Sequence, residues 1–161
     1  MRSYAAAHAR ARPDHCCHYH PWTDARGIAR LLAALAPDNH VTLVGHSYGA
    51  ETAFKVVART ARPVDCLISI DPVGRRRPSW AAIRAGARVW LNVRAEPSPD
   101  RRSFDDTIGW AGGKYPRPPG PDHAAAPDHA ILADATHGAF RAMMIAEKGG
   151  TSGEALLAGR A

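Results

Sequence analysis

The apolar residues of the chain recur with two alternating periods, one typical of helices and one typical of strands. The first helical stretch begins after Thr23 or Asp24, either of which can cap it, and ends before Pro37. Its apolar positions follow the i, i+3, i+4, i+7 spacing at Ile28, Leu31, Leu32 and Leu35. The pattern predicts an amphipathic helix with one buried face.

Four later runs are short and apolar and contain β-branched residues, as buried strands of a parallel sheet do. They cover residues 41–44, 66–70, 89–93 and 130–133. Stretches with helical spacing separate or follow them, and these begin at Tyr48, near Trp80 and at Gly138, the last reaching Lys148. Strands that alternate with helices in this way predict an α/β fold, a mostly parallel sheet with helices on both faces.

The remaining segments complete a single domain over residues 1–161, which is about the length of one ordinary domain. Residues 5–12 have the pattern of a helix end and residues 16–19 that of a strand. The stretch Glu96–Asp128 is rich in proline and glycine and predicts a long loop or lid. Residues 149–161 predict a frayed tail.

The composition is that of a globular protein, since 45% of the residues are apolar and 22% are charged. No apolar run approaches the roughly 18 residues that a membrane-spanning helix needs, and the N-terminus has no apolar core of a secretory signal. Lys and Arg outnumber Asp and Glu by 21 to 15, but the run Arg75–Arg77 has no interleaved aromatic residues. A solvated loop is therefore expected there, and no nucleic-acid partner.

The cysteines and histidines near the N-terminus indicate neither a disulfide nor a metal site. Neighbouring Cys16 and Cys17 are badly placed to pair with each other, and three cysteines in all favour a reducing compartment, the cytoplasm. Residues 15–20 hold histidines and cysteines, but zinc ligands usually have wider spacing and come from separate segments. We expect no metal and no other cofactor.

The strongest chemical signal is the sequence Gly45-His46-Ser47-Tyr48-Gly49, at the change from strand to helix. A tight turn there forces Ser47 into an unfavourable backbone conformation, so the positions two before and two after it should lack bulk, and Gly45 and Gly49 supply that. The turn lifts the hydroxyl of Ser47 to a helix N-terminus, where negative charge is favoured. Ser47 is the predicted nucleophile. The alternative is a glycine-rich turn without chemistry, or a phosphate-binding loop.

The segment VTLVGHSYGAETA resembles the nucleophile elbow of α/β-hydrolases, and the similarity continues through VDCLISIDPVG to VWLNVRA. It covers roughly residues 20–147 and resembles small bacterial lipase- or esterase-like members of that superfamily. The resemblance implies an ester or thioester substrate of low molecular weight, and nothing in it is specific to one substrate. It also implies the chain order nucleophile, acid, histidine.

This order requires a base late in the chain, because a serine hydroxyl is a poor nucleophile without one. His137 is favoured over His129 and His123, since it follows the last predicted strand and opens the last helix, the position that family members use. His46, next to the nucleophile, is expected in the substrate pocket or packed beside it.

Two positions are candidates for the acid that orients the histidine. Asp71 ends the strand after the elbow helix and matches the Asp-Pro context of some lipases, so it is favoured. Most α/β-hydrolases place the acid after the following strand, where the candidates are Glu96, Asp100, Asp105 and Asp106. Asp106 is the best of these.

An acyl-transfer site also needs two N–H donors for the oxyanion. The backbone N–H of Tyr48 supplies one, and the family takes the other from a loop after an early strand. No strand and glycine turn of this kind is found before Gly45. The chain therefore resembles a hydrolase that lacks its N-terminal strands. A weak enzyme, or a catalytically inactive relative that binds a ligand or a protein, is the alternative to a full hydrolase.

Overall fold

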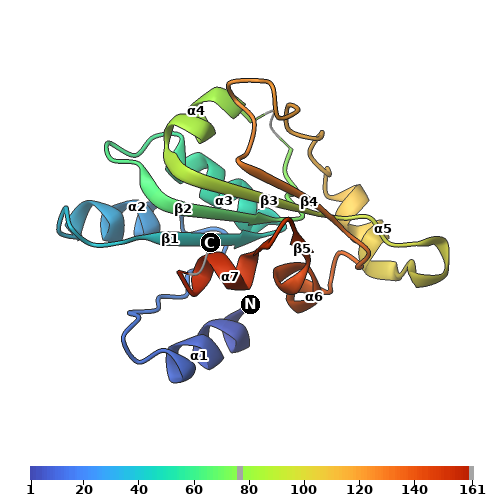
Figure 1. Cartoon of the computed structure of the whole chain (residues 1–161), viewed down its shortest axis with the longest axis horizontal. Helices are drawn as coiled ribbons and strands as arrows, with labels where there is room; N and C mark the ends of the chain where they lie inside the picture. Colours follow the sequence, from blue (N-terminus) through green and yellow to red (C-terminus); the bar gives the residue numbers. More distant parts are fainter. Residues whose placement is uncertain (76–77, 160–161) are drawn as a thin grey trace.

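The computed structural model describes residues 1–75 and 78–159 and contains a four-stranded parallel sheet (Figure 1). The strands lie in chain order, and they are β1 Thr42–His46, β2 Val64–Ile70, β3 Ala87–Ala95 and β4 His129–Ala133. Each strand pairs with its neighbours in parallel, for example through Leu43 opposite Leu67 and Leu67 opposite Trp90. The predicted α/β fold is confirmed.

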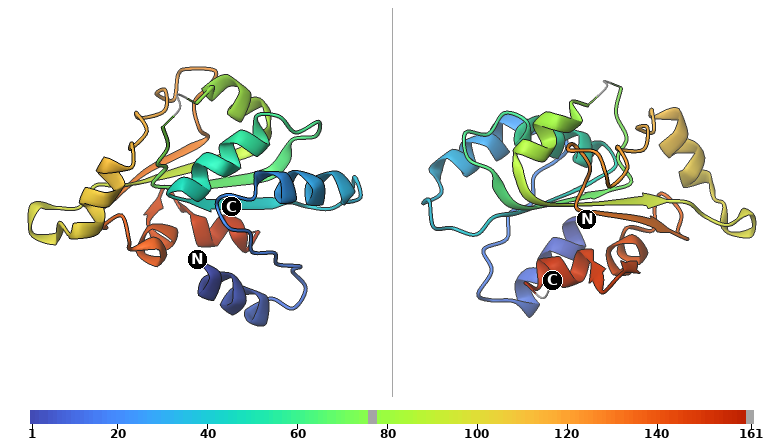
Figure 2. Two further views of the ribbon diagram at one scale, coloured as in Figure 1. Left: turned by 180° about the vertical axis from the view of Figure 1, so that it is seen from behind. Right: turned by 45° about the horizontal axis from the view of Figure 1, so that its top comes forward.

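Helices cover both faces of this sheet, as Figures 1 and 2 show from different sides. On one face lie α2 Ala25–Ala34, α3 Tyr48–Val57 and α4 Trp80–Ala85. On the other lie α1 Arg2–Ala11, α6 Phe140–Ile145 and α7 Gly153–Leu157. The side chains of each strand alternate between the two faces of the sheet. They therefore contribute to two apolar clusters, one under each layer of helices.

The cluster under α3 and α4 contains the largest buried side chain, Trp90, and a small polar network. Its indole N–H donates to the Ser69 hydroxyl over 2.9 Å, and that hydroxyl donates to Asn92 over 2.9 Å. All three residues are buried, and buried polar groups need hydrogen-bond partners. These two bonds satisfy the indole N–H, the Ser69 hydroxyl and Asn92 Oδ1. The cluster on the other face, under α6, includes Phe140, Met143 and Met144.

The helix starts follow the expected chemistry. Asp24 caps α2, because its carboxylate accepts the Gly27 N–H over 2.9 Å. Ser79 and Ser152 cap α4 and α7 in the same way. The first strand, predicted over residues 41–44, continues for two more residues, to His46. The last strand, predicted from residue 130, begins one residue earlier, at His129.

Four expectations differ from the structure. Residues 16–19 form no strand. The stretch Glu96–Asp128 is not all loop, because it contains the 3-10 turn η1 Pro99–Arg101 and the helix α5 Phe104–Ala111. The last predicted helix is shorter, since α6 ends at Ile145 and the hairpin of β5 Glu147–Lys148 and β6 Thr151–Ser152 follows.

The tail is the fourth difference. Residues 151–153 are buried and α7 packs beside α6, so the segment up to residue 159 is ordered against the body of the protein. The apolar residues Leu156 and Leu157 of α7 contact the core, and this packing stabilises the short helix. Residues 160–161, and Arg76 and Arg77 of the arginine run, lie outside the described residues, and Arg75 is exposed.

Candidate active site

The turn from β1 into α3 has the strained geometry of a nucleophile elbow. Ser47 has φ 57° and ψ −128°, and a positive φ is uncommon for any residue except glycine. Hydrogen bonding to β2 stabilises this strained conformation, since the Ser47 N–H donates to the Ile70 carbonyl over 3.0 Å. The Ser47 carbonyl in turn accepts the N–H groups of Ala50 and Val73. Such strain persists only where the surroundings impose it.

The two glycines of the elbow are not equivalent. A Cβ atom at Gly45 would lie 2.6 Å from both the Ala50 Cα and the Gly49 carbonyl oxygen, so the close approach of strand and helix requires glycine. A Cβ atom at Gly49 would meet nothing within 4 Å. The expectation that both positions must lack bulk is therefore wrong for Gly49, which points into open space on the first turn of α3.

Three polar side chains meet at the carboxyl edge of the sheet. His137 Nε2 lies 3.0 Å from Ser47 Oγ, and His137 Nδ1 lies 2.7 Å from Asp71 Oδ2. Ser47 follows β1, Asp71 follows β2 and His137 follows β4, and the carboxyl ends of parallel strands share one edge. With a neutral imidazole, Nδ1–H donates to Asp71 and the Ser47 hydroxyl donates to Nε2.

Asp71 is almost completely buried, with 1% of its surface exposed. Its Oδ1 accepts the Ala95 N–H over 3.1 Å and lies 3.1 Å from Lys114 Nζ. Burial alone would raise the pKa of this carboxyl, but the hydrogen bond from His137 and the charge of Lys114 outweigh it, so the pKa of Asp71 lies below its ordinary value. The residue is ionised at neutral pH and can stabilise a charged imidazole.

Asp106, the other favoured acid, contacts His137 by a different route. Its Oδ1 accepts the backbone N–H of His137 over 2.7 Å, so it fixes the main chain and not the ring. Gly109 on the same helix α5 lies against the imidazole, since a Cβ atom there would be 2.9 Å from His137 Cγ. The stretch Glu96–Asp128 thus contributes a helix that packs against the histidine.

The other candidate residues lie in different contacts. His129 belongs to β4 and pairs with Leu91, and His123 accepts the Ala125 N–H within its own turn. Among the remaining acids, Glu96 pairs with Arg117 at the surface, and Asp100 and Asp105 are exposed. Of the three late histidines, the structure brings His137 to Ser47.

His46 packs against His137. Its Nε2–H donates to the His137 carbonyl over 2.8 Å, and the two rings are 5.1 Å apart between centroids. Phe140 contacts its other side at 5.5 Å. Burial holds the pKa of His46 below its ordinary value, which favours the neutral form. These contacts place His46 against His137, and it does not line the groove described next.

A groove of about 890 Å³ lies along α3 and α4, and Arg75 also lines it. Ser47, Asp71 and His137 are not among its lining residues. Its size is in the range of small-molecule sites. Tyr48, which directly follows Ser47, lies on its wall, and its hydroxyl donates to the Gly112 carbonyl over 2.9 Å. Half of the other lining residues are aromatic or basic, and Glu51 is acidic; the aromatic and basic ones are Trp22, Phe54, Tyr115, Lys55, Arg59 and Arg75.

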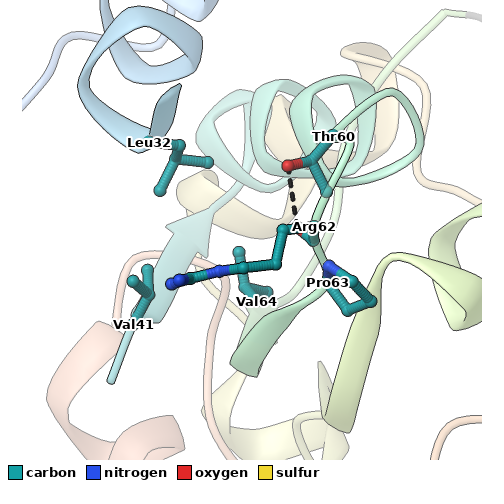
Figure 3. Close-up of a pocket in the computed structure, with 6 residues that line it drawn as sticks. All are labelled: Leu32, Val41, Thr60, Arg62, Pro63 and Val64. Atoms are coloured by element: carbon teal, nitrogen blue, oxygen red, sulfur yellow. Dashed lines mark hydrogen bonds between the residues drawn. The ribbon is translucent and has the colours of Figure 1, made fainter. Parts of the chain in front are cut away.

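A second, much smaller hollow of about 20 Å³ lies at the opposite end of the sheet (Figure 3). Val41 and Val64, which line it, stand at the amino ends of their strands, away from Ser47. The Thr60 hydroxyl closes it by donating to the Arg62 carbonyl over 2.8 Å (Figure 3). This space is enough for about one water molecule, not for a substrate.

No group of three or more His, Cys, Asp or Glu side chains in residues 1–75 and 78–159 is arranged to hold a metal ion. In the same part of the chain, no helix is long and apolar enough to cross a membrane.

A parallel sheet with a strained serine between its first strand and the following helix defines the α/β-hydrolase class of folds. A comparison with protein families agrees, because the model of the alpha/beta hydrolase fold matches residues 6–96. The chain belongs to this family. The matched segment contains the elbow and Asp71 and ends before His137. No curated protein and no solved structure matches the chain.

Sequence reasoning missed two contacts of this site, Lys114 on Asp71 and Gly109 on the imidazole. Both residues come from the stretch expected to be a loop, and its fold depends on contacts with distant segments. Lys114 is positioned by an isolated antiparallel bridge to Val73, which no local pattern indicates.

Proposed function

We propose that the protein is a serine hydrolase that cleaves a small carboxylic ester or thioester through an acyl-enzyme on Ser47. The observation that carries this proposal is the continuous hydrogen-bonded series from Ser47 Oγ through His137 to Asp71, with distances of 3.0 and 2.7 Å. Both are within the reach that proton transfer needs. The strained backbone of Ser47 and the family of the chain support the same function.

In this mechanism His137 acts as the base. Nε2 takes the proton of the Ser47 hydroxyl while Oγ attacks the carbonyl carbon of the substrate. The C–O or C–S bond to the leaving group then breaks, and the imidazolium gives its proton to the departing alkoxide or thiolate. Water attacks the acyl-enzyme with the same base, which releases the carboxylic acid and restores Ser47. Asp71 holds Nδ1–H and stabilises the transient charge on the ring.

The oxyanion of the tetrahedral intermediate would be bound by the Tyr48 N–H. This N–H belongs to the first turn of α3, where backbone donors lack intrahelical acceptors and the helix dipole favours negative charge. Residues 1–41, which the structure describes in full, form only α1 and α2 and no strand with a glycine turn. One missing donor typically costs about 2.7–4 kcal/mol, or roughly 10²–10³ in rate.

The groove beside Tyr48 supports a small-molecule substrate. Its aromatic walls suit an apolar acyl chain, and its basic side chains favour a substrate with an anionic part. The three cysteines are unpaired, which supports the reducing cytoplasm as the compartment.

A fluorophosphonate probe tests the proposal directly, because Ser47 Oγ would attack the phosphorus and displace fluoride. We expect labelling of the wild-type protein, no labelling of Ser47→Ala, and a rate reduced by roughly 10³–10⁴ in Asp71→Asn. His137→Gln should lose labelling, whereas the matched control His129→Gln should keep it. Hydrolysis of matched oxygen and thiol esters of one acid then defines the substrate class.

The alternative is a catalytically inactive member of the family that binds a ligand or a protein partner. The lack of a strand with a glycine turn among residues 1–41 favours it. A folded wild-type protein that the probe does not label, with no hydrolysis of either ester, would support this alternative and overturn the hydrolase.

A further inference from the structure

Lys114 lies on the buried carboxylate of the site. Its Nζ is 3.1 Å from Asp71 Oδ1 and donates to the Ala95 carbonyl over 2.7 Å. The lysine side chain is 28% exposed, whereas Asp71 is 1% exposed. A cation in this position is unlike the surface ion pairs of the chain, because one partner is fully removed from water.

The lysine is held there by a strap, which we define as residues 112–115. The strap runs antiparallel to the turn after Asp71, with Lys114 opposite Val73. The Gly74 N–H donates to the Gly113 carbonyl over 2.9 Å, and the Tyr115 N–H donates to the Pro72 carbonyl over 3.2 Å. These backbone bonds fix the main chain at Lys114, and the bond of Nζ to the Ala95 carbonyl holds the ammonium group beside Asp71.

Glycine is required at one point of the strap. Gly113 has φ 91°, a conformation that other residues rarely adopt. A Cβ atom there would lie 2.8 Å from the Gly74 carbonyl oxygen. The strap can therefore approach the Asp71 turn closely only with glycine before Lys114.

The two oxygens of Asp71 have separate partners. Oδ2 faces His137, while Oδ1 accepts from Ala95 and Lys114. With both oxygens bound, the carboxylate cannot rotate without losing at least one charge-assisted hydrogen bond. The contacts of Oδ1 therefore orient the carboxylate toward the imidazole as much as the contact of Oδ2 with His137 does.

We propose that Lys114 is a positioning residue of the site, which holds the Asp71 carboxylate toward His137 and offsets its negative charge, and so extends the activity of Ser47 to lower pH. The inference rests on the proposed hydrolase function. A carboxylate without a neighbouring cation favours the protonated imidazole, which cannot act as a base. A cation on the far oxygen weakens that preference, so we expect removal of Lys114 to favour the protonated ring.

Among the other charged groups around the pair, Arg94 also interacts with Asp71 electrostatically, but Lys114 is the cation in contact with Oδ1. Arg94 on β3 donates to the Tyr115 carbonyl, Asp106 accepts the His137 backbone N–H, Asp105 lies beside Gly138, and the ring of His46 faces that of His137. Of these, only Lys114 forms an ion pair with Asp71 besides that of His137 itself. Its removal therefore takes away the cation that contacts the carboxylate.

The test compares the pH dependence of kcat/KM for a small activated ester in four proteins: wild type, Lys114→Met, Lys114→Arg and Lys148→Met. Methionine keeps the length of the side chain without its charge. Lys148 is an exposed lysine on β5 and serves as the matched control. We expect the midpoint of the acidic limb to move to higher pH by about one unit in Lys114→Met, the size typical of one nearby charge. At pH values on that limb kcat/KM then falls about tenfold.

Lys114→Arg should stay near the wild type, and Lys148→Met should match it. If Lys114 only stabilises the fold, Lys114→Met would lower kcat/KM by one factor at every pH and leave the limb in place. That result would overturn the inference. Thermal unfolding of each variant shows whether it is folded under the assay conditions.

A second readout does not need activity. The ring signals of His137, assigned by their absence in His137→Gln, are titrated by NMR in wild type and in Lys114→Met. A titration that moves to higher pH in Lys114→Met supports the charge coupling even if a fluorophosphonate does not label the protein, in which case only the hydrolase proposal fails. An unchanged titration overturns the inference whether or not the protein is active.

Discussion

Substitution of the two elbow glycines by alanine should have opposite effects, although both flank the same serine. At Gly45 the new methyl group would lie 2.6 Å from the Ala50 Cα and the Gly49 carbonyl oxygen, and 2.8 Å from the Ala50 N. All three atoms belong to the backbone, so no side chain can rotate away. The start of α3 would have to withdraw from β1 by roughly 1 Å to restore ordinary contact.

Overpacking of this kind typically costs about 1–3 kcal/mol of stability. For a domain of this size about 2 kcal/mol lowers Tm by roughly 4–8 °C. The same movement displaces Ser47 from His137, and a shift of about 1 Å can cost roughly 10²-fold in rate. Gly45→Ala is therefore expected to lower both Tm and the rate of fluorophosphonate labelling.

Gly49→Ala meets no atom within 4 Å and lies in the first turn of α3. Alanine is favoured over glycine in helices by about 0.5–1 kcal/mol, so this variant should be as stable as the wild type or slightly more stable. Urea unfolding followed by circular dichroism measures both free energies, and the labelling rate measures the position of Ser47. A Gly45→Ala protein with wild-type stability, or equal losses in the two variants, would refute the steric reasoning.

Three further outcomes concern pH and thiols. A thiol reagent added to the folded protein should titrate the exposed Cys16 and Cys17 but not Cys66, because burial raises the pKa of Cys66 to about 12; fast reaction of all three thiols would contradict its burial. Burial also raises the pKa of Tyr4 from 10.0 to about 12. The unfolded chain then loses this proton first, so its contribution to the free energy of unfolding is present below pH 10.0 and is lost toward pH 12. Tyr4→Phe should reduce this alkaline loss in urea titrations. The pKa of Asp71 lies below its ordinary value of 3.8, so its contribution is present above that pH and is lost as the pH falls further; Asp71→Asn should flatten the acid limb of the stability curve.

The strands and Ser47 could be predicted from local signals in the sequence, and Asp71 and His137 from the chain order that the family resemblance implies. Buried parallel strands have apolar runs, and the elbow has its glycines at fixed offsets from Ser47. The order of these strands then places Ser47, Asp71 and His137 after carboxyl ends that share one edge of the sheet. Local patterns are enough for the strands and the elbow.

The helix α5 and the strap could not be predicted, because long-range contacts decide their structure. Proline and glycine surround α5 and hide its short helical run, whose Phe104 and Trp110 are exposed and give no clear apolar face. The role of Gly49 was misjudged for a related reason. Spacing around a serine shows where glycine occurs, but only the position of the neighbouring backbone shows which glycine is required.

The two candidate acids can be reconciled by what each one holds. Asp71 takes the ring of His137 through Nδ1, and Asp106 takes its backbone N–H, over equal distances of 2.7 Å. The ring contact can change the charge on the imidazole directly, whereas the backbone contact fixes where the residue lies. Loss of Asp106 should therefore misplace the base and reduce the rate at every pH, without the displaced acidic limb expected for Lys114→Met. The two substitutions separate position from charge at one histidine, which a comparison of Asp71 variants alone cannot do because Asp71 supplies both.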